Sequence, residues 1–178
     1  MRAINKIAVI GFMGSGKSSV AAHLAPQIGL SLFEMDDEIV HRSGFQSIPE
    51  IFEVKGEPFF RELEADVARA LAERSGLLIS TGGGAVELPQ NIECLKNNGG
   101  LIIYLRTSLN RIVERIGDIS NRPLFRDPER VSQLYIRRMP LYESHADLIV
   151  DTDGRSVAHV CSTIVELLKD AQLHGKIA

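Results

Sequence analysis

The sequence G-F-M-G-S-G-K-S at residues 11–18 decides the fold, because it has the form of a phosphate-binding loop: glycine, four residues, glycine, lysine, serine. An apolar stretch at residues 7–10 precedes it, and a helical pattern follows it. Its glycines let the backbone turn N–H groups toward phosphate oxygens. Lys17 would reach the β- and γ-phosphates, Ser18 would bind Mg²⁺, and the positive end of the next helix favours anions. The sequence therefore predicts a nucleotide-phosphate site.

The composition is that of a globular protein with one domain and one core over residues 1–178. Hydrophobic residues make up 44% and charged residues 24%, and the formal net charge is −3. This charge argues against nucleic-acid or membrane partners held by bulk electrostatics. Separately, we expect a monomer. Cys94 and Cys161 lack metal-ligand spacing, which favours buried thiols in a reducing compartment. With no signal peptide or long apolar stretch, we expect a cytoplasmic protein.

Strands and helices alternate along the chain, which predicts an α/β fold. The expected strands are residues 6–10, 30–33, 77–80, 101–105 and 148–150. The expected helices are residues 17–28, 38–41, a short one after the capping-box signal at 47–50, 58–74, 89–97, 108–116, 129–139 and 156–173, with Pro140 interrupting the next to last. Residues 117–128 are polar and are expected to form a lid. Such an alternation implies a parallel sheet covered on both faces, with ligands at the carboxyl ends of its strands.

Six segments together resemble the shikimate kinase family. They are residues 11–18, D-D-E-I-V-H-R-S-G at 36–44, G-E-P-F-F-R-E-L-E at 56–64, S-T-G-G-G-A-V at 80–86, N-R-P-L at 121–124 and R-R-M-P-L-Y at 137–142. The resemblance implies a three-layer phosphate-loop kinase fold with a five-stranded sheet in the order 2-3-1-4-5. It also implies transfer of the γ-phosphoryl group of Mg-ATP to the 3-hydroxyl of shikimate, in aromatic amino acid biosynthesis. The expected substrate-binding region is residues 34–64.

Asp36 matches the family aspartate that grips the substrate hydroxyls and acts as the base for the attacking one. Phosphoryl transfer needs one carboxylate to orient the nucleophile and take its proton. The alternative is that Asp36 caps the next helix. The family usually has a second aspartate where this chain has Glu34, which is expected to reach Mg²⁺ through water. Because the third strand ends in Ser80 and Thr81 instead of an aspartate, Ser18 is expected to be the direct protein ligand of Mg²⁺.

Arg61 and Arg138 match the pair of arginines that holds the substrate carboxylate, a task suited to the planar guanidinium. Glu64 lies one helical turn from Arg61 and could orient it. In the family the glycines Gly82, Gly83 and Gly84 line the shikimate site, although they could equally form a tight turn after a buried strand.

Arg122 lies in the expected lid and matches the arginine that reaches the transferring phosphate on closure. Arg115 matches a residue that stacks on adenine, although it could instead be a helix C-terminal cation. Phe52 and Phe60 could line the site or belong to the core. The expected nucleotide site comprises Gly14, Ser15, Gly16, Lys17, Ser18, Ser19, Arg115 and Arg122. The catalytic groups would be Asp36, Lys17 and Arg122, and four converging cations, Lys17, Arg61, Arg122 and Arg138, predict a locally positive pocket.

Two other functions are compatible with the phosphate loop alone. A kinase for gluconate or a nucleoside monophosphate could share the fold, but the paired arginines and the glycine triplet favour shikimate. A GTP-switched binding protein would need a guanine-reading N-K-x-D, whereas Asn5 and Lys6 are followed by Ile7 and Ala8. The sequence therefore favours a small-molecule kinase.

Overall fold

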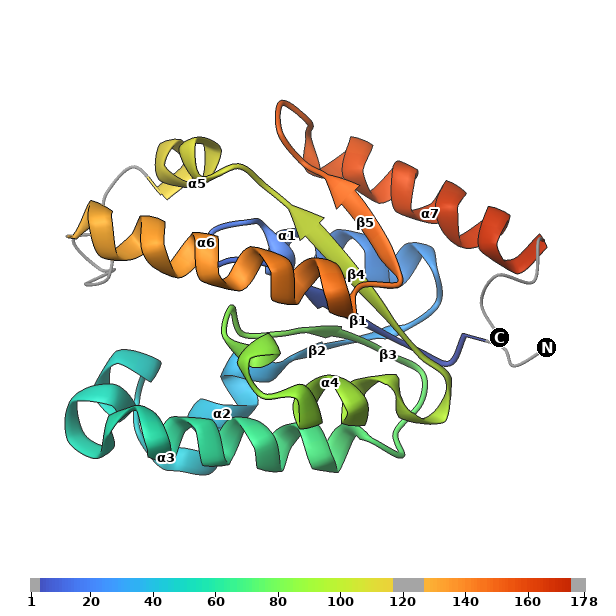
Figure 1. Cartoon of the computed structure of the whole chain (residues 1–178). Coiled ribbons are helices and arrows are strands. Elements are labelled where there is room, and N and C mark those ends of the chain that lie inside the picture. Colours follow the sequence, from blue (N-terminus) through green and yellow to red (C-terminus); the bar gives the residue numbers. More distant parts are fainter. Residues whose placement is uncertain (1–3, 117–126, 174–178) are drawn as a thin grey trace.

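The computed structural model describes residues 4–116 and 127–173, which build a parallel sheet with helices on both faces (Figure 1). The strands are β1 Lys6–Ile10, β2 Ser31–Glu34, β3 Leu77–Ser80, β4 Gly100–Arg106 and β5 Leu148–Asp151. Their order in the sheet is β2-β3-β1-β4-β5, and all four neighbouring pairs are parallel. The predicted fold class and strand order are confirmed.

The helices lie close to the predicted positions. They are α1 Lys17–Leu24, α2 Met35–Ser43, α3 Ile48–Leu71, α4 Pro89–Lys96, α5 Leu109–Ile116, α6 Pro128–His145 and α7 Val157–Leu173. Three short 3₁₀ helices follow α1, the third strand and α4: η1 Ala25–Gln27, η2 Ala85–Glu87 and η3 Asn97–Gly99.

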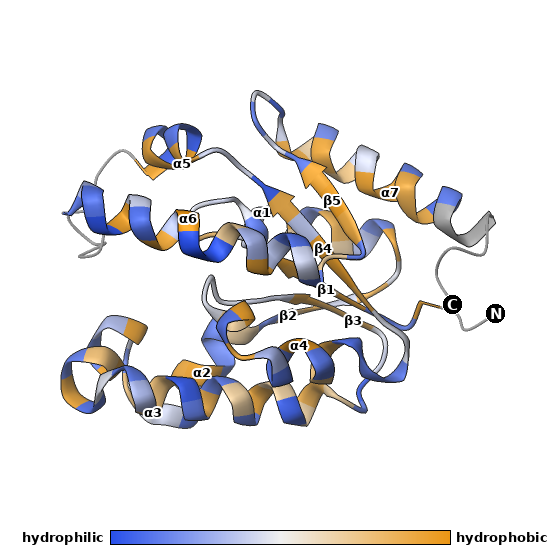
Figure 2. Cartoon of the chain, in the orientation of Figure 1, coloured by the Kyte–Doolittle hydropathy of each residue, from blue (hydrophilic) through white to orange (hydrophobic). Residues whose placement is uncertain are grey.

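The sheet separates two apolar cores because alternate side chains of each strand point to opposite faces. In β1, Ile7 and Val9 pack with residues of α1 and α7, whereas Ala8 and Ile10 pack with residues of α2, α3, α4 and α6. Figure 2 shows the strands as the most continuous apolar part of the chain, with polar residues toward the outer sides of the helices. A sheet buried in this way fixes where the strands end.

Two helix boundaries differ from the prediction. The helix α2 begins at Met35, so that Asp36 lies in its first turn instead of preceding it. Pro140 does not interrupt α6, which continues to His145. A proline removes one helical hydrogen bond, but Arg138 and Tyr142 are buried on either side of it and hold the helix against the sheet.

The two helices predicted around residue 56 form one element, α3, bent at Gly56, which has φ of 80°. Ser47 caps its start, as predicted: its side chain accepts a hydrogen bond from the Glu50 N–H at 3.3 Å. After the bend, α3 carries Arg61 and Glu64 near the carboxyl ends of the strands and then runs back to their amino ends, where Leu71 contacts Lys6 at the start of β1.

The lid prediction at residues 117–128 falls largely outside the described residues, and so does Arg122. Within the described ranges, no helix is both long enough and apolar enough to cross a membrane.

Lys6 is fully buried, and its ammonium donates hydrogen bonds to the carbonyls of Leu71 and Ala72 at 2.8 Å each. These bonds give partners to backbone carbonyls at the end of α3 that have no partner within the helix.

Candidate active site

The phosphate loop, residues 11–18, connects β1 to α1 and has the backbone conformation that the sequence predicts. Gly14 and Gly16 have φ of 80° and 95°, values that glycine adopts without strain. The Lys17 ammonium is nearly buried and donates to the carbonyls of Gly11 and Phe12, at 2.9 and 3.0 Å. The loop thus presents backbone N–H groups and one lysine at the start of a helix, which is an anion-binding arrangement.

Oxygen donors from three elements meet beside the loop. The Ser18 hydroxyl donates to Glu34 Oε2 at 3.2 Å and lies 3.3 Å from the Ser80 hydroxyl. Such a set of hydroxyl and carboxylate oxygens fits Mg²⁺, which takes few protein ligands and keeps several waters. Within the described ranges there is no cluster of three histidine, cysteine or acidic side chains that could hold a metal by itself. The residues present therefore fit a magnesium ion shared with a nucleotide.

Asp36 is half-buried, but its Oδ1 is fully buried and has no hydrogen-bond partner among the described residues. The N-cap residue of α2 is Glu34, so Asp36 does not cap the helix. Burial raises the pKa of the Asp36 carboxyl above its ordinary value, while the positive charge of Lys17 opposes the shift. A buried carboxylate oxygen without a partner is costly for folding and available to a substrate hydroxyl.

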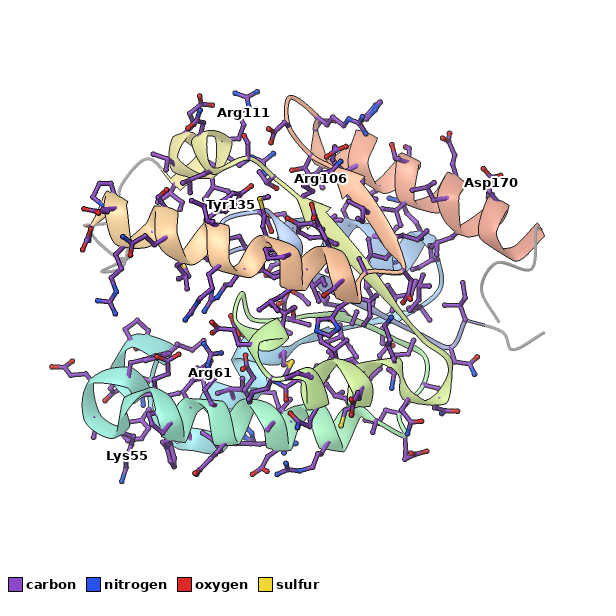
Figure 3. All side chains as sticks on the ribbon, viewed as in Figure 1. Lys55, Arg61, Arg106, Arg111, Tyr135 and Asp170 are labelled. Carbon is purple, nitrogen blue, oxygen red and sulfur yellow. The ribbon has the colours of Figure 1, made fainter. Side chains whose placement is uncertain are left out.

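Arg61 projects from α3 toward α6 and pairs with three carboxylates (Figure 3). Its Nη1 donates to Glu64 at 2.7 Å, and its Nη2 donates to Glu57 at 3.0 Å and to Glu87 at 3.1 Å. Glu64 is fully buried, and its contact with Arg61 agrees with the prediction that it orients this side chain. Its second oxygen, Oε1, has no hydrogen-bond partner in the described part of the chain.

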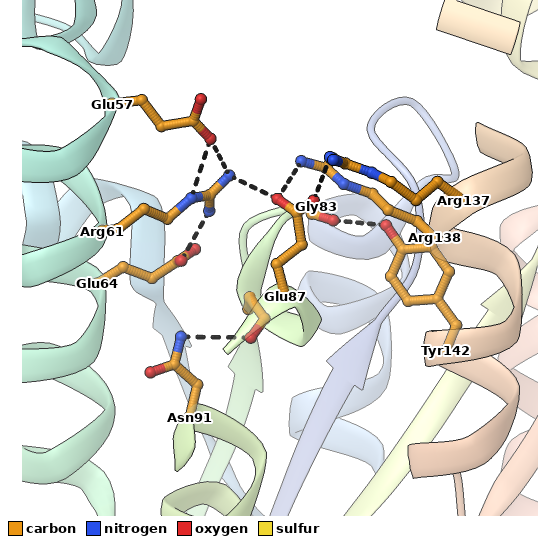
Figure 4. Close-up of polar contacts among 10 residues, drawn as sticks. Glu57, Arg61, Glu64, Gly83, Glu87, Asn91, Arg137, Arg138 and Tyr142 are labelled. Carbon is orange, nitrogen blue, oxygen red and sulfur yellow. Dashed lines mark hydrogen bonds and ion pairs between the residues drawn. The ribbon is translucent and has the colours of Figure 1, made fainter. Parts of the chain in front are cut away.

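Arg138 approaches the same place from α6 and is only 4% exposed. Its Nη2 donates to Glu87 Oε2 at 2.8 Å, whereas its buried Nε lacks an acceptor among the described groups (Figure 4). Its guanidinium lies over the ring of Phe12, 6.0 Å from the ring centre. The structure therefore brings Arg61 and Arg138 together across one carboxylate. The expected excess of positive charge is wrong for this pair, because Glu57, Glu64 and Glu87 offset it.

The glycine turn, Gly82 to Gly84, lies between these charged side chains. A Cβ atom at Gly82 would lie 2.8 Å from Asp36 Oδ1 and 3.2 Å from Glu64 Oε1. A Cβ atom at Gly84 would collide with both terminal nitrogens of Arg61. The Gly83 carbonyl accepts a hydrogen bond from the Tyr142 hydroxyl of α6 at 2.5 Å. The glycines therefore do more than turn the chain: they leave room for the ionised groups to approach the backbone.

Arg115 lies beside the phosphate loop. It donates to the carbonyls of Ser15 and Thr152, both at 3.1 Å, so it joins the loop to the segment after β5 instead of capping its own helix. A cavity of about 370 Å³ opens next to it, lined by Arg111, Glu114, Arg115, Gly154, Arg155 and Ser156. The volume and the planar cations suit an aromatic base.

The two phenylalanines differ in their surroundings. Phe60 is buried in the core, and Phe52 is 37% exposed, with ring centres 4.8 Å apart. The Arg61 guanidinium lies 5.3 Å from the centre of the Phe60 ring. Phe60 is therefore a core residue that also supports Arg61.

The sequence-based interpretation missed three parts of the site: Glu87, Tyr142 and the loop at residues 152–156. The loop follows the carboxyl end of β5, and that position alone could have marked it. Glu87 follows the glycine turn by three residues, and no residue pattern signalled that its carboxylate would meet two arginines from distant helices.

Comparisons with known proteins agree with this geometry. A family model described as shikimate kinase matches residues 13–169. A shikimate kinase of Thiobacillus denitrificans is 41% identical over 167 residues, which cover 90% of each chain. One from Burkholderia lata is 39% identical over 172 residues, 95% of this chain and 91% of the relative. The solved structure of shikimate kinase from Acinetobacter baumannii in complex with shikimate has a TM-score of 0.88 and 32% identity, covering 97% of each chain.

The raised pKa of the Asp36 carboxyl leads to a prediction about the stability of the fold. Because its pKa is raised in the folded protein, the ionised form destabilises the fold, and Asp36→Asn should raise the free energy of unfolding by roughly 1 kcal/mol near neutral pH. The gain should shrink as the pH falls through the folded pKa of Asp36, because the wild-type carboxyl then becomes neutral. Urea unfolding at several pH values measures both.

The exposed neighbour provides the control: Asp37→Asn should change stability by less than about 0.5 kcal/mol. A gain from Asp36→Asn that is the same at every pH would show that ionisation of Asp36 carries no cost.

Proposed function

This chain belongs to the shikimate kinase family, and we propose how its described residues carry out the reaction. The protein is an ATP-dependent shikimate kinase: it transfers the γ-phosphoryl group of ATP to the 3-hydroxyl of shikimate, giving shikimate 3-phosphate and ADP. The observation that supports our assignment of residues is that Asp36 and Arg61 approach the glycine turn while Glu87 joins Arg138 to Arg61. We also propose a cytoplasmic location, where the free Cys94 and Cys161 stay reduced.

The phosphate loop and its neighbours bind the nucleotide. Backbone N–H groups from Gly14 to Ser19 surround the phosphates, and Lys17 turns from the loop carbonyls to the β- and γ-phosphates. Ser18 would hold Mg²⁺, with Glu34 acting through water, and the ion would neutralise phosphate charge. Arg115 would stack on adenine in the cavity that it lines together with residues 154–156. Arg122, outside the described residues, would add positive charge to the transferring group.

Shikimate binds between α2, α3, the glycine turn and α6. Arg61 and Arg138, here called the arginine pair, hold its carboxylate, and the buried Nε of Arg138 offers a donor for it. Gly82 and Gly83 let the ring lie close to the backbone, and the Asp36 oxygens accept hydrogen bonds from the hydroxyls. The two ends of the substrate are thus fixed by opposite charges.

Asp36 then acts on the 3-hydroxyl. As the oxygen of the 3-hydroxyl forms a bond to the γ-phosphorus, the bond from that phosphorus to the bridging oxygen of ADP breaks. Asp36 accepts the hydroxyl proton. Burial raises the pKa of Asp36, which makes it a better proton acceptor than an exposed aspartate. Lys17 stabilises the charge that moves to the departing ADP.

A coupled assay of ADP release tests the substrate. Turnover is expected with shikimate and not with gluconate, AMP or CMP at equal concentrations. Among these four compounds, only shikimate has both a carboxylate for the arginine pair and ring hydroxyls for Asp36. Turnover of one of the other three substrates alone would overturn the assignment.

Asp36→Asn should lower kcat by at least about a hundredfold, the usual contribution of a general base, while shikimate still binds. Steady-state kinetics and calorimetric titration measure the two effects separately. A kcat near the wild-type value would remove Asp36 from the reaction.

Gly84→Ala should raise KM for shikimate at least about tenfold, because the added methyl group displaces the Arg61 guanidinium from the carboxylate site. KM for ATP should change little. Gly29→Ala is the control: no heavy atom lies within 4 Å of its added Cβ, so it can cost stability without affecting KM for shikimate. An unchanged KM in Gly84→Ala would argue against Arg61 as a substrate ligand.

A further inference from the structure

Glu87 already holds the arginine pair that the substrate carboxylate needs. Its Oε2 accepts hydrogen bonds from Arg61 Nη2 at 3.1 Å and from Arg138 Nη2 at 2.8 Å (Figure 4). Its Oε1 accepts a third from the exposed Arg137, at 2.5 Å. One carboxylate thus bridges α3 and α6 from the short helix η2.

Glu87 is charged and firmly placed. Burial by itself would raise the pKa of Glu87, but the hydrogen bond from Arg138 and the charges of Arg138, Arg61 and Arg137 outweigh it and lower the pKa. Its backbone N–H donates to the Gly84 carbonyl at 3.0 Å, which ties Glu87 to the glycine turn. At neutral pH it therefore presents a full negative charge to the arginine pair.

The other two nitrogens of Arg61 also donate to carboxylates. Nη1 donates to the buried Glu64, and Nε donates to Glu57 at 3.3 Å. A substrate carboxylate that binds Arg61 and Arg138 therefore either takes the place of Glu87 on their Nη2 atoms or lies beside Glu87 on the same guanidinium groups. In the first case it breaks existing charged hydrogen bonds, and in the second it meets a like charge at short range. Both cases weaken the binding of the carboxylate.

We propose that Glu87 competes with the shikimate carboxylate for Arg61 and Arg138 and so lowers the affinity of the site for carboxylates, an inference that rests on the proposed arginine pair. A ligand that offers only a carboxylate is weakened by this competition and makes no hydrogen bond to Asp36. Shikimate is weakened to the same extent, but its hydroxyls also donate hydrogen bonds to Asp36. Glu87 therefore makes the carboxylate contact weak by itself, so a carboxylate without the hydroxyl contacts occupies the site less often.

Glu87→Gln tests the competition, because it removes the charge and keeps the size and a hydrogen-bond acceptor. In calorimetric titrations, Kd for shikimate should fall roughly tenfold, a modest part of the repulsion between two carboxylates on one arginine pair. Kd for cyclohex-1-ene-1-carboxylate, which has the ring and carboxylate without hydroxyls, should fall at least as much. Kd for the methyl ester of shikimate, which has no carboxylate charge, should stay within about twofold of the wild-type value.

Glu57→Gln is the matched control. Glu57 also pairs with Arg61, but its side chain is 58% exposed and, among the described residues, it makes no ion pair with Arg138. This variant should change Kd for shikimate by less than about twofold, since exposed ion pairs contribute little. Equal tightening in both variants would show a general charge effect and overturn the role of Glu87.

Two further results would overturn the proposal. Weaker binding of shikimate to Glu87→Gln would mean that Glu87 holds the arginines in place for the substrate. Equal tightening for shikimate and its methyl ester would mean that the carboxylate is not the group that competes.

The variant Arg138→Lys tests the arginine pair separately from Glu87. If it leaves Kd for shikimate unchanged, the arginine pair itself is wrong. If it weakens shikimate binding and Glu87→Gln does not strengthen it, only the competition by Glu87 is wrong.

Discussion

The parallel sheet is the constraint on which the site depends. Because all five strands run in one direction and are buried between helices, their carboxyl ends lie along one edge. The pairing of Val9 and Glu34 with the same residue, Ser80, shows how closely β1, β2 and β3 end together. The phosphate loop, the start of α2 and the glycine turn follow these ends directly. Residues far apart in the sequence therefore meet without any long loop to bring them together.

Burial of charge is the second constraint, and it explains the unusual number of acidic groups near a site for an anionic substrate. Arg138 and Glu64 are almost without solvent, and an isolated charge in such a place would be very costly. Arg138 is paired with Glu87, and Glu64 is paired with Arg61. Because Glu87 also pairs with Arg61, the four side chains form a row of alternating charges. If Arg61 and Arg138 hold the shikimate carboxylate as proposed, its recognition depends on an exchange of short-range contacts more than on long-range attraction.

Most of the fold could be predicted from the sequence because apolar periodicity and glycine positions determine it locally. The strand at 6–10 and the strand at 77–80 were placed correctly, whereas the predicted break at Pro140 was wrong because tertiary contacts of Arg138 and Tyr142 hold α6 together. The phosphate loop could be recognised from its own residues. The meeting of Arg61 with Glu87 could not, since it depends on how α3 and η2 pack, which no local pattern encodes.

The nucleotide half of the site consists of other chemical groups than the acceptor half, and this difference explains why the nucleotide half was easier to identify from the sequence. The nucleotide half consists mainly of backbone groups: N–H groups of the phosphate loop, and the carbonyls of Ser15 and Thr152 that fix Arg115. A nucleotide site made of backbone groups can be combined with many different acceptor sites, and it occurs in many kinases. The acceptor half consists of side chains from separate elements, whose charges must match one another before they match a substrate. A single change there, at Arg61 or Glu87, alters the balance of the whole network, so substrate specificity resides in the acceptor half.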